Sequence, residues 1–256
     1  MITSYSEKEK QILAEAERLK DISYKYGISY CFREDKNYPS SLKQIANMPP
    51  LIYYKGNIEI INNNRNLAII GSRQFSANGK NISFNTGKLA SEAGLNVVNG
   101  LALGCDTEAL KGALSANGKC IAILPCGLDD VQPKTNRKLA EEILEKGGCL
   151  LSEYPVGTRI QKYMYVERDR LQSGISQGVI IIEAEKESGT MHTAKYAINQ
   201  YKRLACYYHR MLEMSSGNKY LEDIGKAEIL KSDHDLQIFL QTIVKENDYE
   251  QLTFDF

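Results

Sequence analysis

The stretch Leu67-Ala68-Ile69-Ile70-Gly71-Ser72-Arg73 places four apolar residues directly before a glycine, a hydroxyl and a guanidinium. Helical spacing follows from Gly79 to Ala90, so the unit predicts a buried strand, a tight turn and a helix. Gly71 lets the backbone approach a ligand closely, a helix start offers unpaired N–H groups, and Arg73 can fork onto a phosphate. The unit therefore predicts an anion site; the alternative is an ordinary strand-to-helix turn with a surface arginine.

Short apolar runs recur outward from this unit, with helical segments between most of them. Runs without alternation are typical of strands covered on both faces, and intervening helices favour parallel crossovers. The predicted strands are 67–70, 96–99, 120–124, 149–152, 178–184 and 203–208. The sequence thus predicts an α/β fold with an extended Rossmann-like, doubly wound and mostly parallel sheet. In such sheets ligands bind beyond the carboxyl ends of the strands.

Three segments are expected along the chain. Residues 1–62 form a preface packed on the core, with an amphipathic helix from Ser6 to Tyr26, a short strand at 28–32 and an apolar run after Pro49-Pro50. A polar tract at 62–66 separates this preface from the Rossmann-like domain, residues 63–235. Residues 236–256 form a C-terminal helix and tail.

The amino-acid composition limits the kinds of binding site and cellular location that we expect for this chain. Lys plus Arg and Asp plus Glu balance at 32 each, so a site for a polyanion must be a local patch. The six cysteines are scattered without a C-x-x-C pair, the start of the chain is charged, and no apolar run approaches the ~18 residues of a membrane helix. A cytoplasmic protein without membrane segments is expected.

The residues after the predicted strands carry the candidate contacts. A loop is expected after the strand 149–152, and it combines cations with flat rings, as a grip on a single nucleic-acid strand requires. Its members are Lys162, Tyr163, Tyr165, Arg168 and Arg170. Gly100 follows the strand 96–99, and Ser188-Gly189-Thr190 opens a helix after 178–184.

Nothing in the pattern demands catalysis. The three histidines lack metal spacing, and no nucleophile is paired with a base. Asp106 and Glu153 are candidates for an acid–base pair. A binding protein without cofactor or metal is predicted.

A series of ordered blocks carries a family resemblance. The blocks are Tyr38-Pro39 with 49–56, Gly71-Ser72-Arg73, Asn99-Gly100-Leu101-Ala102 with Gly104 and Asp106, Gly127-Leu128-Asp129 with Pro133 and Asn136, Ser152-Glu153-Tyr154-Pro155 with Gly157-Thr158, Arg168 and Arg170, and Glu183-Ala184 with Ser188-Gly189 and Thr193-Ala194. In these blocks the chain resembles the DprA/Smf family of DNA-processing proteins, over about residues 28–230.

The resemblance implies a sequence-independent single-stranded DNA-binding protein that acts in DNA processing, transformation and recombination. It implies a homodimer that protects the strand and hands it to a RecA-type recombinase. It also implies a DNA- and phosphate-binding pocket made of Gly71, Ser72, Arg73, Gly100, Lys162, Arg168, Arg170, Ser188, Gly189 and Thr190. The resemblance further implies that Asp106 and Glu153 hold turns together instead of forming an acid–base pair.

Two departures from that pattern open other interpretations. Asp169 stands between Arg168 and Arg170 where the family usually has Asn, which places a carboxylate against the DNA backbone. Ser188-Gly189-Thr190 also echoes the Gly-Thr turn of LOG-like Rossmann proteins, but no Glu follows it. The alternative function is therefore a non-catalytic or weakly catalytic nucleotide sensor, for example in phage defence.

The end of the chain carries one more pattern. Gln251-Leu252-Thr253-Phe254 loosely resembles a peptide that binds a sliding clamp, and the other interpretation is an edge strand or frayed end against the preceding helix.

Overall fold

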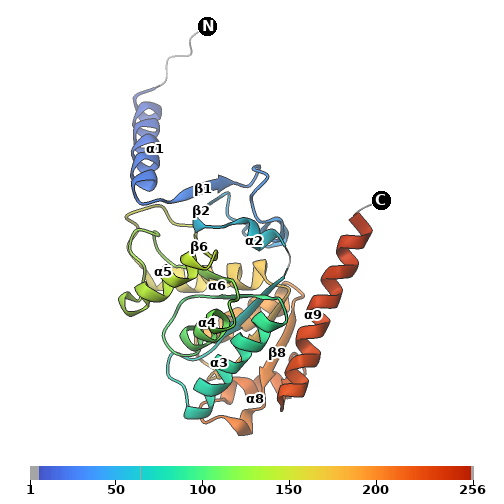
Figure 1. Ribbon diagram of the computed structural model, residues 1–256. Coiled ribbons are helices and arrows are strands. Elements are labelled where there is room, and N and C mark those ends of the chain that lie inside the picture. Colours follow the sequence, from blue (N-terminus) through green and yellow to red (C-terminus); the bar gives the residue numbers. More distant parts are fainter. Residues whose placement is uncertain (1–5, 64, 255–256) are drawn as a thin grey trace.

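The computed structural model describes residues 6–63 and 65–254, with side chains through residue 245. Over these residues the chain forms one nine-stranded sheet in the order β1-β2-β6-β5-β4-β3-β7-β8-β9, with helices against it (Figure 1). The strands are β1 (Ser29–Phe32), β2 (Leu51–Gly56), β3 (Asn66–Ile70), β4 (Asn96–Asn99), β5 (Cys120–Ile123), β6 (Cys149–Ser152), β7 (Gly178–Ile181), β8 (Arg203–Tyr207) and β9 (Glu228–Leu230).

The helices alternate with the strands. They are α1 (Glu7–Lys25), α2 (Glu59–Asn62), α3 (Ala77–Glu92), α4 (Cys105–Ser115), α5 (Arg137–Glu145), α6 (Lys162–Ile175), α7 (Thr190–Asn199), α8 (Ser216–Asp223) and α9 (Asp233–Phe254), with short 3-10 turns at Ser40–Gln44, Lys134–Asn136 and His209–Met211. Strands β3 to β9 pair in parallel, whereas β2 runs antiparallel to both β1 and β6. The predicted α/β, mostly parallel and doubly wound sheet is confirmed.

The central strands are buried on both faces. Leu67 and Ile69 of β3 belong to the core shared with α3, α4, α5 and α9, whereas Ala68 and Ile70 belong to the core beneath α6, α7 and α8. Successive side chains of a strand point to opposite faces, so a strand between two helical layers needs apolar residues at every position. This requirement explains the unbroken apolar runs of the sequence.

The winding direction reverses between β3 and β7. From β3 the chain proceeds through β4 and β5 to β6, and α6 then carries it back to β7 on the other side of β3. Adjacent loops diverge at such a reversal and leave a crevice beyond the carboxyl ends of the strands. The turn Gly71-Ser72-Arg73 and the segment after β7 therefore flank one crevice.

The structure corrects the sequence prediction at three places. Residues 162–170, expected as a loop, form most of helix α6. Strand β7 ends at Ile181 instead of residue 184, because Glu183 turns out of the sheet to bond other loops. Strand β9 was not predicted, since its three residues are too few to show a period.

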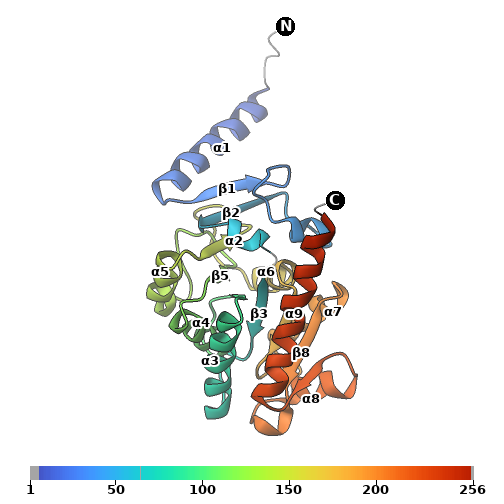
Figure 2. The same ribbon diagram turned by 45° about the vertical axis from the view of Figure 1, so that its right-hand side comes forward.

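The two terminal helices lie differently against the body. Helix α1, which the amphipathic pattern predicts, begins at a capping box between Ser6 and Glu9 and projects past the edge strand β1 (Figures 1 and 2). Helix α9 instead buries Leu236, Phe239 and Ile243 in the core. Among the described residues, no helix combines the length and apolar character needed to cross a bilayer.

Helices α3 and α4 pack with their backbones unusually close. A Cβ built on Gly87 of α3 would overlap the carbonyl of Ala109, and one built on Gly112 of α4 would overlap the carbonyl of Phe84. Small residues at a crossing let two helices approach until their backbones touch, so these glycines set the spacing of the layer that holds the loop after β4.

We expect Gly112→Ala to lower the free energy of unfolding by about 1–3 kcal/mol, because the new methyl overlaps a backbone carbonyl that no rotamer change can move. The cost of this overlap should exceed the roughly 1 kcal/mol by which alanine stabilises a helix relative to glycine. Urea denaturation measures the difference. Lys111→Ala, an exposed change on the same helix, should stay within about 0.5 kcal/mol of wild type; equal stabilities for the two variants would contradict the close packing.

Candidate functional site

A cavity of about 500 Å³ opens at the reversal between β3 and β7. Loops after four strands, β3, β4, β7 and β8, and one face of α6 line it. The lining comprises Ile70, Gly71, Ser72, Arg73, Gln74, Ala102, Asp106, Tyr165, Arg168, Asp169, Gln172, Glu185, Ser188, Gly189, Thr190, Thr193 and Met214. Pockets of roughly 300–1,000 Å³ at such switch points are the usual ligand sites of α/β proteins.

The Gly71-Ser72-Arg73 turn is held tightly against its neighbours. A side chain at Gly71 would collide with Cys105, and one at Gly104, where φ is +84°, would collide with the carbonyl of Ser72. The Ser72 amide donates to the carbonyl of Glu183 at 2.7 Å, and the Ser72 carbonyl accepts from the amide of Cys105 at 3.0 Å. The Ser72 amide predicted to face a ligand is therefore already used within the fold.

Arg73 is the exposed cation of the cavity lining. Its guanidinium carbon lies 5.0 Å from the centroid of the Tyr165 ring, within cation–π range. Neither its amide nor its guanidinium has a hydrogen-bond partner among the described residues. Arg73 is thus placed to meet a ligand at the mouth of the cavity, beside a flat ring.

Glu183 holds the loops around the cavity, a role that the sequence analysis missed. Its carboxylate is fully buried and accepts hydrogen bonds from the Ser76 amide at 2.9 Å and the Met214 amide at 2.8 Å. The Ser76 hydroxyl and the Glu213 amide donate to it as well. A glutamate directly after a buried apolar strand was the available signal, because such a carboxylate must find several donors.

One face of α6 forms the wall opposite the turn. Tyr165, Arg168, Asp169 and Gln172 occupy positions i, i+3, i+4 and i+7, which share one side of a helix. All four line the cavity. Gln172 is a site residue that the sequence analysis missed, and helical spacing from Tyr165 would have found it.

Arg168 is buried among carboxylates instead of presented to solvent. Only 5% of the residue is exposed, and its Nη1 donates to the carbonyl of Ile123 at 2.9 Å. Its Nε lies 3.1 Å from Asp169 Oδ1. A Cβ at Gly100 would overlap its guanidinium, so Gly100 serves to make room for Arg168.

Asp106 holds the turn after β4, as the sequence analysis favoured. Its Oδ2 accepts from the amides of Gly100 at 3.0 Å and Ala102 at 3.3 Å. Burial raises the pKa of Asp106 to about 6, against the lowering effect of Arg168 and the two amides, with Asp169 adding to the rise. Burial likewise raises the pKa of Asp169, although Arg168 opposes it. The guanidinium of Arg168 is thus the largest opposing influence on the raised pKa of both carboxyls.

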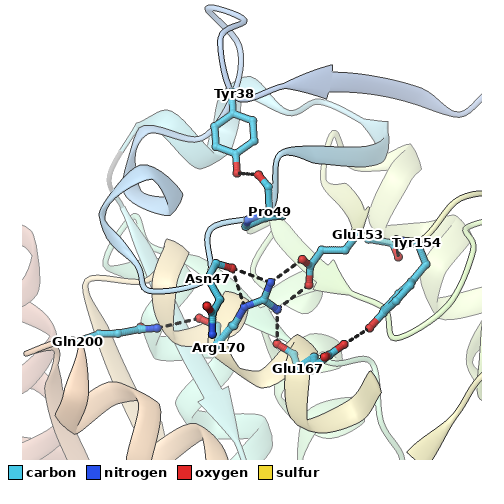
Figure 3. A network of polar contacts seen from close by, with 9 residues as sticks. Tyr38, Asn47, Pro49, Glu153, Tyr154, Glu167, Arg170 and Gln200 are labelled. Carbon is cyan, nitrogen blue, oxygen red and sulfur yellow. Dashed lines mark hydrogen bonds and ion pairs between the residues drawn. The ribbon is translucent and has the colours of Figure 1, made fainter. Parts of the chain in front are cut away.

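Arg170 does not share the cavity with Arg168, which corrects the expected cationic pair. Its guanidinium forms a two-pronged ion pair with Glu153 and donates to the carbonyls of Asn47 and Glu167 (Figure 3). Residues two apart on a helix point about 200° apart, so Arg168 and Arg170 face different neighbours. Arg170 ties α6 to the segment between the first two strands.

The other predicted site residues divide into two groups. Ser188, Gly189 and Thr190 line the cavity, whereas Gly100, Lys162 and Arg170 are not among the described residues that do. Lys162 is exposed at the first position of α6. The lining also carries the carboxylates Asp106, Asp169 and Glu185 beside Arg73 and Arg168, so its charge is mixed.

Among the described residues, no group of three or more His, Cys, Asp or Glu side chains is arranged to hold a metal ion.

Sequence comparisons place the chain beside known DNA-processing proteins. The model of the family described as DNA recombination-mediator protein A matches residues 29–241. DNA processing protein DprA of Streptococcus pneumoniae is 33% identical over 204 residues, which cover 79% of this chain and 71% of that protein. Protein Smf of Synechocystis is 35% identical over 66% of this chain, and Protein Smf of Borreliella burgdorferi is 33% identical over 76% of it. The matches span only 43% and 61% of those two relatives.

Solved structures show the same relationship. DNA processing protein A from Helicobacter pylori, described for its single-stranded DNA binding mode, superposes with a TM-score of 0.76 at 29% identity, covering 85% of this chain and 97% of that one. The Streptococcus pneumoniae protein gives 0.75 at 31% identity, with 84% and 76% covered. A molybdenum cofactor binding protein from Rippkaea orientalis, at 0.51 and 16% identity over 70% of this chain and 96% of that one, shares the fold alone.

Removing one partner of the Arg170 ion pair should destabilise the fold. We expect Arg170→Ala to lower the free energy of unfolding by about 3–5 kcal/mol, since it leaves Glu153 and the carbonyl of Asn47 without their partner. Denaturant melts of both variants compare it with Arg73→Ala, which removes an exposed group and should change stability by less than about 0.5 kcal/mol. Comparable losses in the two variants would refute this division of roles.

The burial of Asp106 predicts a pH dependence of stability, because it raises the pKa of this carboxyl. The folded-state pKa of Asp106 lies above the ordinary value of 3.8, at about 6, so the folded protein binds the proton more tightly than the unfolded chain. The contribution of Asp106 to the free energy of unfolding is therefore greatest below about pH 4, and it is lost as the pH rises through 6. Relative to Asp106→Asn, which keeps an acceptor for the two amides, wild type should lose stability between pH 4 and pH 7 in denaturant melts. Parallel pH profiles would disprove the raised pKa.

Proposed function

The chain belongs to the family of DNA recombination-mediator protein A, and on that premise we propose that its switch-point cavity binds single-stranded DNA by gripping the sugar–phosphate chain. One observation carries the proposal: an unpaired, exposed Arg73 stands over the Tyr165 ring at the mouth of a 500 Å³ cavity. A cation for a phosphate beside a ring for a base face is what sequence-indifferent strand binding uses.

Each contact has a distinct part in the proposal. Arg73 pairs with a phosphate, and the amides and hydroxyls of Ser188, Gly189 and Thr190 border the same space. Lys162, exposed on the first turn of α6, meets the strand where it leaves the cavity. Arg168 positions the surrounding loops from its buried place, and Arg170 serves the fold.

The function is binding without chemistry. Burial raises the pKa of Cys105 and of Cys126 to about 12, so neither thiol supplies a nucleophile at neutral pH. The carboxylate of Asp106 is occupied by backbone amides, and that of Glu153 by Arg170. A non-catalytic cytoplasmic protein follows as part of the proposal.

The biological setting is proposed from the family. A recombination mediator delivers a strand to a recombinase, so a RecA-type protein is the expected recipient, and a homodimer is the expected assembly. The sliding-clamp peptide at Gln251-Leu252-Thr253-Phe254 stays a prediction, because its side chains lie outside the described residues.

Arg73→Ala should weaken binding of labelled oligo-dT and reduce the slope of log affinity against log salt by roughly 0.7–1, as expected for one lost phosphate contact. Titrations monitored by fluorescence anisotropy at several salt concentrations measure both quantities. Arg33→Ala, which removes an exposed arginine outside the cavity lining, is the control and should leave both unchanged. An Arg73→Ala protein that binds as tightly as wild type would show that the cavity is not the DNA site.

The nucleotide-sensor alternative is tested with the same protein. A mononucleotide that raises the melting temperature while oligo-dT binds weakly would favour a sensor, because a ligand stabilises the state to which it binds. Salt-sensitive oligo-dT binding without a mononucleotide shift favours the strand-binding function.

A further inference from the structure

Two buried oxygen atoms of the cavity lining have no hydrogen-bond partner among the described residues. The Oε1 atom of Gln172 accepts no hydrogen bond, although only 2% of that residue is exposed, and the buried hydroxyl oxygen of Ser188 is likewise unpaired. Both residues line the cavity. Leaving a buried acceptor unpaired costs about 1–3 kcal/mol, so such groups at a cavity wall indicate a ligand that supplies the missing donors.

The Gln172 acceptor is fixed beside a carboxylate. Its Nε2 donates to Asp169 Oδ1 at 2.8 Å, which defines the amide orientation and turns Oε1 away from that bond. Asp169 also lines the cavity, with 7% of the residue exposed. The carboxylate and the amide oxygen thus form two neighbouring acceptors, which we call the acceptor pair.

The acceptor pair excludes some ligand groups and suits others. A phosphate brings only acceptors, so it cannot satisfy the two oxygens of the acceptor pair and belongs near Arg73. A group with two adjacent N–H donors satisfies both oxygens at once. Unpaired bases in single strands are read through their Watson–Crick edges in this way.

Resting on the proposed function, we propose that the cavity holds one unstacked base of the bound strand and that the acceptor pair of Asp169 and Gln172 makes this subsite prefer guanine. Guanine alone among the four DNA bases presents two adjacent donors, N1–H and the 2-amino group, on its pairing edge. Its O6 is an acceptor, for which the unpaired Ser188 hydroxyl is an available donor. The remainder of the strand is held without regard to sequence.

The test compares short oligonucleotides bound to the 256-residue chain. Three labelled probes share an oligo-dT sequence and differ at one central position, which carries thymine, guanine or hypoxanthine. Hypoxanthine lacks only the 2-amino group of guanine. We expect the guanine probe to bind about tenfold more tightly than oligo-dT, the usual scale of a two-pronged base contact, and the hypoxanthine probe to lose most of that gain.

Two variants assign the preference to the acceptor pair. Asp169→Asn should no longer distinguish guanine from thymine. Gln172→Met removes the amide oxygen at similar volume and should reduce the preference as well, with circular dichroism reporting whether each variant is folded. The comparison of the three probes on wild type needs neither variant.

The possible results separate this inference from the proposed function. Equal wild-type affinity for the three probes, with binding still lost in Arg73→Ala, overturns the guanine subsite and leaves strand binding intact. A guanine preference that survives in folded Asp169→Asn and Gln172→Met overturns its assignment to the acceptor pair. Failure of every probe to bind overturns both proposals.

Discussion

The hydrogen bond from the Ser72 amide to the Glu183 carbonyl, 2.7 Å long, joins the loops that leave β3 and β7. These strands are parallel neighbours whose connections run in opposite directions across the sheet. The bond closes the base of the crevice that this reversal opens, and the Glu183 carboxylate then fastens Ser76 and Met214 around it. The position of Arg73 depends on this junction, because its turn is anchored there at both ends.

The two arginines of the cavity differ in how deeply they are buried. Arg168 lies inside the fold between two carboxyls, where desolvation raises the pKa of both Asp106 and Asp169. Arg73 lies at the mouth with an aromatic ring beneath it. A ligand therefore meets a cation at the entrance and mainly oxygen atoms at the wall of α6. This division favours a phosphate outside and a base inside, which a uniformly cationic surface would not do.

Much of the sheet was predictable because its strands are buried on both faces, and unbroken apolar runs such as 67–70 signal that environment directly. The cavity turn was predictable from the glycine that follows this apolar run, although Gly71 makes room for Cys105, where the sequence suggested room for a ligand. Helix α6 was not. Its cations and tyrosines obscure the apolar period, so the segment resembled a loop, and Arg168 and Arg170 were taken as a pair.

The sequence by itself determined the α/β class, the order of the main elements and the turn that carries Arg73, because these follow from local patterns of apolar residues and glycine. Only the tertiary structure decided which polar side chains meet. The helical twist of α6 sends Arg168 into the cavity wall and Arg170 to Glu153, and the winding reversal brings Gln172, Ser188 and Arg73 around one space. These are contacts between distant segments, and their partners are chosen by geometry that no local pattern records.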